Sequence, residues 1–409
     1  MEKINTFPLQ GFFALQSTSF RRFLYGSFLI RTSEWMDLTI LNWVVYQWTN
    51  SPLMLGLLNA CRLLPIFFFS LPAGILADRF DRLKMLTLAY FGLCISTFLI
   101  AMFVQEKLPI FWLLTAITVR SFLSTIEVPI RNAFLSDLVP KSMLANGIAI
   151  QTTIINLSRI IGPALAGVLL VHSSPGILMY FVSLGSLFAM ISLFLIQPIE
   201  QNGKSDEKQG NKESIKETFR YIDQNPKVLS VLLIAIAPMV FGFPYTTMLP
   251  IFSKELLGMG PDGFGLLLSV SSVGAIVSTI LLSIGQPNNS RRLLVLSALG
   301  FGTGLCFFTL FNHSYTLILL FMFLIGLASQ FYRTLSRVVL QLNVSERYRG
   351  RVLSIALMDR GYIPLGALIV GWVGSSFGAY SAGLFMGLGC ILSTLCITLL
   401  RKNLWNGQE

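Results

Sequence analysis

Hydrophobic residues in this chain gather into long runs, and most of these runs are long enough to cross a membrane as a helix. A membrane-spanning helix needs about 20 mostly apolar residues, and twelve segments of the sequence meet that length. They cover residues 21–47, 53–77, 84–105, 109–135, 144–171, 176–198, 227–251, 263–285, 292–312, 315–341, 352–375 and 379–400. The pattern predicts an all-α membrane protein with twelve transmembrane helices.

A polar segment, residues 199–226, separates the first six spans from the last six. Its first part has the composition of a flexible linker. Further on, Ile215, Phe219 and Ile222 are spaced to share one face of a short helix, which fits a helix lying on the inner membrane surface. The predicted domains are a six-helix bundle at 1–198, a cytoplasmic linker with a short surface helix at 199–226, and a second six-helix bundle at 227–409.

The two halves of the chain resemble each other. Gly162-Pro-Ala-Leu-Ala-Gly167 in the fifth span matches Gly366-Ala-Leu-Ile-Val-Gly371 in the eleventh, at an offset of 204 residues. Gly56 in the second span corresponds in the same way to Gly265 in the eighth. Transporters built from two such repeats bind their substrate near the bilayer midplane and rock one repeat against the other. The repeat therefore predicts two pseudo-symmetric bundles and alternating access.

Composition and charge agree with a membrane protein and indicate its orientation. Only 12% of the residues are charged, against about 25% in soluble domains. The net charge is +11, but the basic loop residues lie almost entirely on one side of an even-numbered set of spans. The loops on the opposite side contain little beyond Lys107 and Lys254. Because Lys and Arg accumulate in cytoplasmic loops, both termini are expected in the cytoplasm, and the charge does not indicate a nucleic-acid partner. The five cysteines lie in apolar spans without metal-ligand or disulfide spacing, so no metal or cofactor is expected.

The loop after the second span, Gly74-Ile-Leu-Ala-Asp-Arg-Phe-Asp-Arg82, places an acid and several bases at a membrane surface. Asp78 can form charge-assisted bonds to guanidiniums at the start of the eleventh span, where the helix N-terminus adds partial positive charge. We interpret this arrangement as a latch that closes the cytoplasmic side. Its residues are Gly74, Asp78, Arg79, Arg82, Arg349 and Arg351. In the simpler alternative, the bases only set the topology.

Several motifs, in their order along the chain, resemble those of the major facilitator superfamily. The loop at 74–82 looks like the signature loop of that family, although Asp81 stands where the family has a glycine. Asn156-Leu-Ser-Arg-Ile-Ile-Gly-Pro163 resembles the fifth-helix motif of its antiporters, and Arg349-Gly-Arg-Val-Leu-Ser354 resembles the matching stretch of the second half. Over residues 18–400 the chain is similar to the bacterial drug, macrolide and siderophore exporters of this superfamily. The resemblance implies transport, usually export driven by inward proton flow, and leaves the substrate open.

Charged residues inside the spans are costly in hydrocarbon and usually face a cavity, a partner or a proton route. Glu34 and Asp37 lie three residues apart in the first span and therefore share a face. Depths counted along the helices predict two pairs, Asp37 with Arg62 and Glu34 with Arg159. One stripe of the fourth span consists of Arg120, Ser124, Glu127 and Arg131.

A carboxylate that carries protons needs a pKa near neutral, which desolvation raises and a nearby base lowers. Glu34 and Asp37 are candidates because two acids this close disfavour simultaneous ionisation. Glu127 is a third candidate, and the family resemblance suggests that Arg159, beside Gly162 and Pro163, takes part in the coupling. The alternative is that these residues form static buried salt bridges that only fix helix packing.

Signals for a substrate cavity are weaker, because core and lipid-facing positions account for most of the aromatic residues. The cavity candidates are Trp35, Arg62, Arg120, Phe241 and Tyr245. Gly162-Pro163 and Gly242-Phe243-Pro244 mark backbone breaks where helices can bend. The sequence has no Walker A motif and no catalytic grouping around its two histidines, so we expect no enzyme.

Together these features predict proton-coupled export of a small amphiphilic compound, with drugs, macrolides and siderophore-like molecules as the candidate classes. Proton-coupled import of a small nutrient is the main alternative, because the fold works in either direction. We expect a monomeric, multi-pass protein of the bacterial plasma membrane. Its expected partners are the small-molecule substrate, protons and the lipid bilayer.

Overall fold

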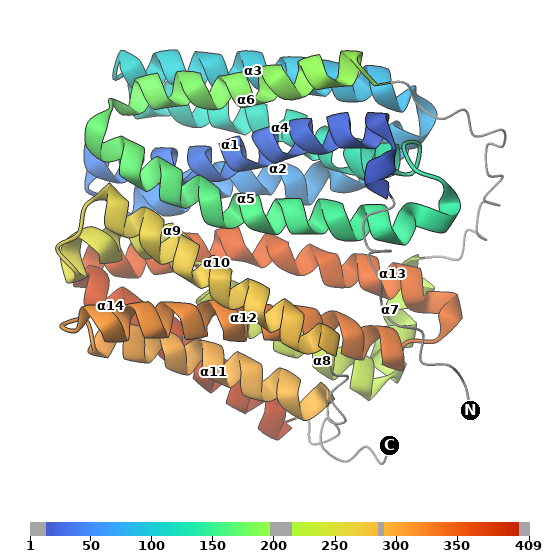
Figure 1. The fold of residues 1–409 in the computed structure, drawn as a ribbon. Helices are drawn as coiled ribbons and strands as arrows, with labels where there is room; N and C mark the ends of the chain where they lie inside the picture. The colour runs from blue at the N-terminus through green and yellow to red at the C-terminus, as the bar shows by residue number, and fades with distance from the viewer. Residues whose placement is uncertain (1–13, 197–214, 285–289, 401–409) are drawn as a thin grey trace, which may run out of the picture. The chain divides into compact units, whose positions relative to one another are not determined.

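The computed structural model describes residues 14–196, 215–284 and 290–400, without some side chains, those of residues 74–79 and 349 among them. Every regular element in this part of the chain is helical, which confirms the all-α class (Figure 1). The helices are α1 (Thr18–Thr49), α2 (Pro52–Arg79), α3 (Arg82–Gln105), α4 (Ile110–Leu135), α5 (Leu144–His172), α6 (Pro175–Phe194), α7 (Ile215–Gln224), α8 (Pro226–Ala237), α9 (Tyr245–Ile251), α10 (Pro261–Ile284), α11 (Ser290–Leu310), α12 (Tyr315–Asn343), α13 (Glu346–Leu357) and α14 (Tyr362–Leu400).

Ten helical stretches of the described part are long and apolar enough to cross a membrane. They do not include α1, whose apolar sequence is interrupted by Arg31, Glu34 and Asp37. The 39-residue α14 covers most of two predicted spans and bends at Gly378, where φ is +84°. Only glycine adopts such a φ readily. Gly378 alone therefore has non-helical dihedral angles between these two spans. The count of twelve spans stays a prediction.

The predicted seventh span is irregular in the structure. Between α8 and the end of this span the chain forms a π-helical turn at Pro238–Gly242, the short α9, and a second π-helical turn at Phe252–Leu256. Proline lacks the N–H that a regular helix uses and crowds the preceding turn, and this span contains Pro238, Pro244 and Pro250. The break expected at Gly242-Phe243-Pro244 is thereby confirmed. In contrast, Pro163 lies inside α5, which continues to His172.

The chain divides into two compact units. Unit 1 comprises Met1–Ile40, Phe68–Gly162 and Ser173–Asp206, and unit 2 comprises Leu41–Phe67, Pro163–His172 and Glu207–Glu409. One boundary lies in the polar segment, but others pass through α1, α2 and α5, because one end of each of these helices packs against helices from the second half of the sequence. The three predicted domains stay a prediction.

Unit 1 is built around α3, which packs against α4 and α6 (Figure 1). Phe23 of α1 meets Phe134 of α4 edge to face, with ring centroids 5.9 Å apart. Both rings are buried in an apolar cluster that also contains Tyr90 and Leu93 of α3. This packing holds α1 beside α4, the two helices that carry most of the buried charges.

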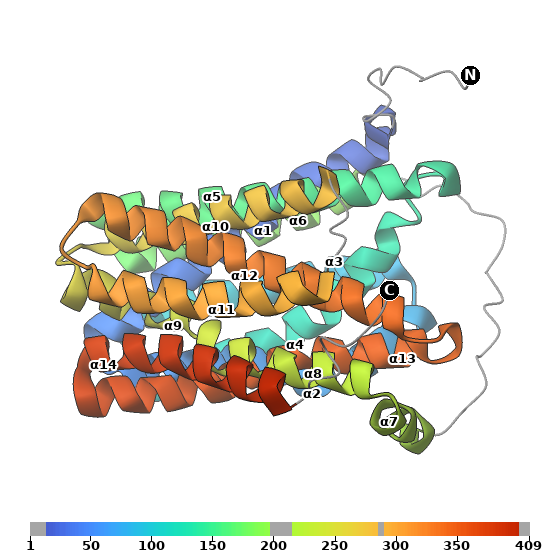
Figure 2. The same cartoon turned by 90° about the horizontal axis from the view of Figure 1, so that it is seen from below.

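Unit 2 contains α7–α14, with α12 packed against α10 and α11, and α11 packed against α14. The short α7 lies at the end of α8, beside α13 (Figure 2). Its Tyr221 ring stacks on Tyr348 of α13 at 4.3 Å, and the Ser345 N–H donates to the Tyr221 hydroxyl at 3.0 Å. The predicted short helix is confirmed, although Ile222 is buried and Phe219 is exposed. The linker residues before it lie outside the described part of the chain.

Candidate functional site

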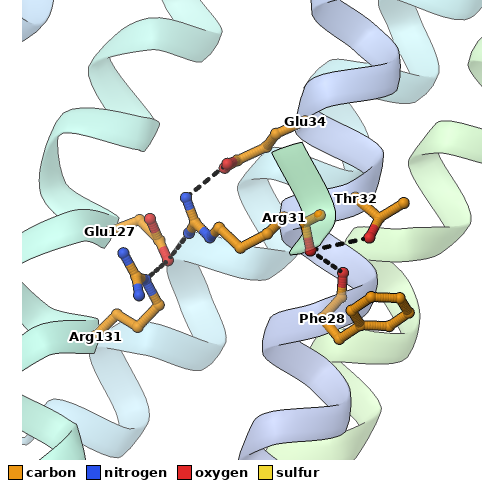
Figure 3. A network of polar contacts seen from close by, with 7 residues as sticks. Phe28, Arg31, Thr32, Glu34, Glu127 and Arg131 are labelled. Carbon is orange, nitrogen blue, oxygen red and sulfur yellow. Dashed lines mark hydrogen bonds and ion pairs between the residues drawn. The ribbon is translucent and has the colours of Figure 1, made fainter. Parts of the chain in front are cut away.

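Four charged side chains of α1 and α4 form one connected network in unit 1 (Figure 3). One terminal nitrogen of Arg31 donates a hydrogen bond to Glu34 Oε2 at 2.6 Å, and the other donates to Glu127 Oε1 at 2.5 Å. Arg131 Nε donates to the same Glu127 oxygen at 3.0 Å. Arg31 therefore joins the two acids across the helix–helix contact.

Helical spacing explains the pairs within each helix. Arg31 and Glu34 lie three residues apart on α1, and Glu127 and Arg131 lie four apart on α4, so each pair shares a face. The two acids differ in access, because the Glu127 side chain is fully buried whereas that of Glu34 is 39% exposed. The network thus connects a fully buried acid to one whose side chain is partly exposed.

Hydrogen bonding within this network is incomplete. Glu127 Oε2, Arg31 Nε and Arg131 Nη1 are buried and have no hydrogen-bond partner in the structure. A partly satisfied buried polar network is costly and can rearrange its bonds. A proton arriving at either acid would therefore change which acid holds Arg31.

Asp37 forms an ion pair with Arg120. Both of its carboxylate oxygens accept from Arg120 of α4, each at 2.6 Å, and both side chains are buried. Sequence depth suggested Arg62 for Asp37 and proposed Arg120 for the substrate cavity. In the structure, the guanidinium of Arg120 instead binds Asp37, because the face of α4 that carries Arg120 is turned toward α1. The predicted pair Asp37–Arg62 stays a prediction.

Glu34 has a partner that the sequence analysis did not name, and the predicted pair Glu34–Arg159 stays a prediction. Glu34 pairs with Arg31, whereas Arg159 of α5 stacks its guanidinium over the Trp35 ring, 5.6 Å from the centroid. Arg31 was overlooked because depth was compared only between helices. The three-residue spacing from Arg31 to Glu34 is a sequence signal that would have found it.

Close packing of α1 on α5 places Arg159 beside Trp35. A Cβ added at Gly162 would lie 2.5 Å from the Trp35 Cβ and 2.9 Å from the Thr32 carbonyl oxygen. One turn away, Thr32 donates to the Ser158 hydroxyl at 3.1 Å. Gly162 is thus needed for close helix approach, and its predicted role with Pro163 as a bend stays a prediction.

Two glycine contacts in unit 2 repeat each other. A Cβ at Gly167 of α5 would lie 2.7 Å from the Pro261 carbonyl oxygen at the start of α10, and one at Gly371 of α14 would lie 2.8 Å from the Pro52 carbonyl oxygen at the start of α2. Gly371 lies 204 residues after Gly167, the offset of the sequence repeat. The two halves therefore make equivalent close contacts at these helix ends.

The companion contacts follow the same rule. Gly265 of α10 faces the Pro163 carbonyl oxygen, and Gly56 of α2 faces the Ala367 carbonyl oxygen, 2.6 Å from the Cβ it would carry. Ala367 is the residue that the 204-residue offset pairs with Pro163. The correspondence of Gly56 with Gly265, inferred from sequence, is thus matched by packing.

Polar side chains join α1 to the end of the seventh span, also within unit 2. The Tyr46 hydroxyl donates to Glu255, and the Lys254 ammonium lies 5.3 Å from the centroid of the same tyrosine ring. Lys254 also donates to Asn50 Oδ1 at 3.3 Å. Sequence reasoning had placed Lys254 only as an isolated loop base on the outer side.

The predicted latch is described only in part. The side chains of Asp78, Arg79 and Arg349 lie outside the described part of the structure, Gly74 lies in α2, and Arg351 is half-buried on α13. Arg82 at the start of α3 donates to Asp137 at 2.9 Å, beyond the end of α4. Burial raises the pKa of the Asp137 carboxyl, and Arg82 offsets only part of that rise.

Asp81, which departs from the family motif, has a clear structural role. It is the N-cap of α3, and its carboxylate accepts the Lys84 N–H at 2.9 Å. Asp is among the preferred residues at this position because it satisfies a backbone donor at the helix start. Only Phe80 and Asp81 separate α2 from α3, so most of the loop expected at 74–84 is helical.

The remaining cavity candidates lie in different surroundings. Tyr245 of α9 is buried, with its hydroxyl 2.6 Å from Ser271 Oγ, and it packs against Phe301. Little of this ring is left for a ligand. Phe241 is half-buried and meets Phe385 edge to face at 5.6 Å, and Arg62 is half-buried on α2. Among the described residues, no group of His, Cys, Asp and Glu could hold a metal ion.

Comparison with known proteins identifies relatives along nearly the whole chain. Residues 10–408 match the family described as "Transmembrane secretion effector". The "Staphyloferrin A transporter" of Staphylococcus aureus (strain NCTC 8325 / PS 47) is 32% identical over 386 residues, which cover 92% of this chain and 94% of the relative. "Macrolide efflux protein A" of Streptococcus pyogenes is 23% identical, covering 79% of this chain and 81% of the relative.

Solved structures of transporters share the fold. The nucleoside transporter NupG superposes with a TM-score of 0.72 at 15% identity, covering 96% of this chain and all of the other. A bacterial homolog of the human lysosomal transporter Spinster gives a TM-score of 0.71 at 17% identity, covering 95% and 96%. The family match and the 32% identical relative extend over more than nine-tenths of the sequence. This chain therefore belongs to the transmembrane secretion effector family of the major facilitator superfamily, as a multi-pass transporter of the bacterial plasma membrane and not an enzyme.

Proposed function

We propose that this protein exports a small amphiphilic compound in exchange for protons, by alternating access of two six-helix bundles within a twelve-helix fold. The proposal rests chiefly on one observation: Arg31 holds a fully buried acid, Glu127, and a partly exposed acid, Glu34, at the same time. Such a shared guanidinium can pass from one acid to the other when either takes up a proton. Static ion pairs need no such sharing.

In this mechanism Glu34 is the acid that exchanges protons with water, because its side chain is the more exposed of the two. Protonation of Glu34 releases one arm of Arg31 and leaves the guanidinium with Glu127. Asp37 is less suited to carry protons, since Arg120 occupies both of its oxygens. Arg159 stacks on Trp35, the residue that follows Glu34 in the sequence, and can therefore couple substrate binding to the protonation of Glu34.

Alternating access is supported by the repeated glycine contacts. Two helix pairs, α5 with α10 and α2 with α14, approach closely at positions related by the sequence repeat. Matched interfaces can open and close together when one half rocks against the other. We further propose that Asp78 with Arg349 and Arg351 latches the cytoplasmic side, that both termini are cytoplasmic, and that the protein acts as a monomer.

The relatives suggest substrates to try first. Their names specify staphyloferrin A for the 32% identical protein and macrolides for the efflux protein. Import of a small nutrient remains the second candidate, because the same fold serves both directions and one of its structural neighbours is a nucleoside transporter.

Inside-out membrane vesicles test this proposal. We expect staphyloferrin A or a macrolide to accumulate in vesicles that contain the protein when the lumen is made acidic, and accumulation to stop when a protonophore removes the gradient. Vesicles without the protein are the control. Loss of a preloaded compound from the lumen under the same gradient would indicate import, and gradient-independent movement would rule out proton coupling.

A further inference from the structure

Positive charge exceeds negative charge inside the membrane-spanning part of this protein. If the first and last two residues of each predicted span are left out, the spans contain eight arginines, no lysine and four acids. The arginines are Arg31, Arg62, Arg120, Arg131, Arg159, Arg333, Arg337 and Arg360, and the acids are Glu34, Asp37, Glu127 and Asp359. With every acid ionised, four positive charges remain in excess.

This excess cannot be removed by proton transfer, because the guanidinium of arginine stays protonated in proteins. Charge at membrane depth is costly, and the residues that carry it usually face a cavity or a partner. A negatively charged substrate lowers the electrostatic cost, whereas a positively charged one raises it. The charge balance therefore favours an anion.

The geometry of Arg159 suits an acidic group. Its guanidinium stacks on the Trp35 ring at 5.6 Å, and in unit 2 Arg333 stacks on Phe243 in the same manner at 4.4 Å. Stacking on a ring uses the flat face of the guanidinium and leaves its N–H donors at the edge. Such a held fork can bind a carboxylate with two parallel bonds.

The protein already contains one example of that bond. Arg120 binds both oxygens of Asp37 at 2.6 Å each, as a substrate carboxylate would be bound. In unit 1 the arginines Arg31, Arg120 and Arg131 pair with the three acids of the spans. Arg159 of α5 is half-buried, and its guanidinium lies over the Trp35 ring.

We propose that the transported compound is an anion with at least one carboxylate, and that Arg159 on Trp35 anchors the carboxylate. This inference rests on the proposed function and narrows its substrate class. It separates carboxylic acids from cationic drugs, between which the proposed function does not decide.

Ligand binding to the purified full-length protein is the first test. Citrate and spermidine are flexible ions of opposite charge, and each is added at matched ionic strength while the melting temperature is followed. We expect citrate to raise Tm in a saturable way and spermidine to have no such effect. Equal effects of both ions, or no effect of citrate, would overturn the inference.

Variants assign the effect to Arg159. Arg159→Gln should weaken the apparent affinity for citrate about tenfold or more, since it removes charge-assisted bonds, whereas Arg220→Gln on exposed α7 loses the same charge and should bind like wild type. Arg159→Lys keeps the charge but not the planar fork, so intermediate affinity is expected, and it replaces Arg159→Gln if that variant does not fold. Unchanged citrate binding in Arg159→Gln would contradict the proposal that Arg159 binds the carboxylate.

Transport of two related dyes separates this inference from the proposed function. Carboxyfluorescein is anionic and rhodamine 123 is cationic, and both contain a xanthene ring. We expect gradient-driven accumulation of carboxyfluorescein in inside-out vesicles. Accumulation of rhodamine 123 alone would support the proposed transport function but contradict the proposal that the substrate is an anion. If neither dye moves while citrate still binds through Arg159, the anion site stands and proton-driven export is what fails.

Discussion

At the scale of single residues, Arg31 is central because two acids depend on it. Its side chain is 9% exposed, and its guanidinium contacts both Glu34 and Glu127. Removing one partner of a buried ion pair leaves the other charge uncompensated, which costs about 3–5 kcal/mol. The network is therefore the place in unit 1 where one substitution has the largest expected effect.

We expect Arg31→Gln to lower the melting temperature strongly, because Glu127 keeps only Arg131. Adding Glu127→Gln should recover part of the loss, since it removes the uncompensated charge. Thermal unfolding of the purified variants measures both effects, with Arg220→Gln as a surface control. A wild-type Tm for Arg31→Gln would mean that the network does not stabilise the fold.

Residue-scale reasoning from the sequence identified the acids inside the spans but not the partners that the structure shows for them, Arg31 and Arg120. Glu34, Asp37 and Glu127 were found because charge inside an apolar run is conspicuous. Their partners depend on the rotation of each helix about its axis and on the reach of each side chain, which depth along the membrane does not specify. This is why Arg120 binds Asp37 and Arg31 binds Glu34.

Asp137 allows a test by pH. Burial raises the pKa of its carboxyl in the folded chain, so the folded state binds this proton more tightly than the unfolded state. Its contribution to stability is then present at low pH and is lost as the pH rises through the folded pKa. We expect Asp137→Asn to melt at or slightly above the wild-type temperature at pH 7, with the difference shrinking toward pH ~4, near the ordinary pKa of Asp. A much lower Tm at pH 7 would show that the bond to Arg82 dominates.

At the scale of helices, small residues determine how closely elements approach. Gly56 and Gly371 bring α2 to α14, and Gly167 and Gly265 bring α5 to α10. These glycines could be paired from sequence because the repeat offset relates them. The irregular seventh span was predicted only as a break, since prolines at 238, 244 and 250 remove backbone donors without specifying which turn replaces the α-helix.

Alanine at Gly56 tests the close approach of α2 and α14. The new Cβ would lie 2.6 Å from the Ala367 carbonyl oxygen, and such overpacking costs about 1–3 kcal/mol. We expect Gly56→Ala to lower Tm and to reduce transport. Gly300→Ala is the matched control, because its Cβ would meet nothing closer than the Ala328 Cβ at 3.9 Å. Equal behaviour of the two variants would show that this contact is not tight.

At the scale of the whole molecule, the account requires the matched interfaces to open during transport. The Leu53 N–H donates to Ser375 Oγ at 3.2 Å, so these residues mark the contact between the start of α2 and α14. In a background without the five native cysteines, a Leu53→Cys/Ser375→Cys cross-link should stop transport, and reduction should restore it. Full transport by the cross-linked protein would contradict opening at this interface.

Much of the architecture could be predicted because membrane helices need long apolar runs and the repeat is visible in the glycines. The division of the chain into its two compact units could not be predicted, since it depends on where the ends of α1, α2 and α5 pack. Sequence patterns indicate the length and polarity of a helix, but contacts such as that of Gly56 with Ala367 determine which unit each end of a helix packs against.

Proton coupling through Glu34 is the central claim, and a matched pair of variants tests it directly. Uptake of staphyloferrin A, or of the macrolide if that is the compound transported, is measured in inside-out vesicles with and without an acidic lumen, for wild type, Glu34→Gln and Glu106→Gln. Glu106 is an exposed glutamate beyond the end of α3, so its variant makes the same chemical change away from the network. We predict that Glu34→Gln keeps movement down the substrate gradient but loses all acceleration by the proton gradient, whereas Glu106→Gln behaves like wild type. Wild-type acceleration in Glu34→Gln would contradict the account.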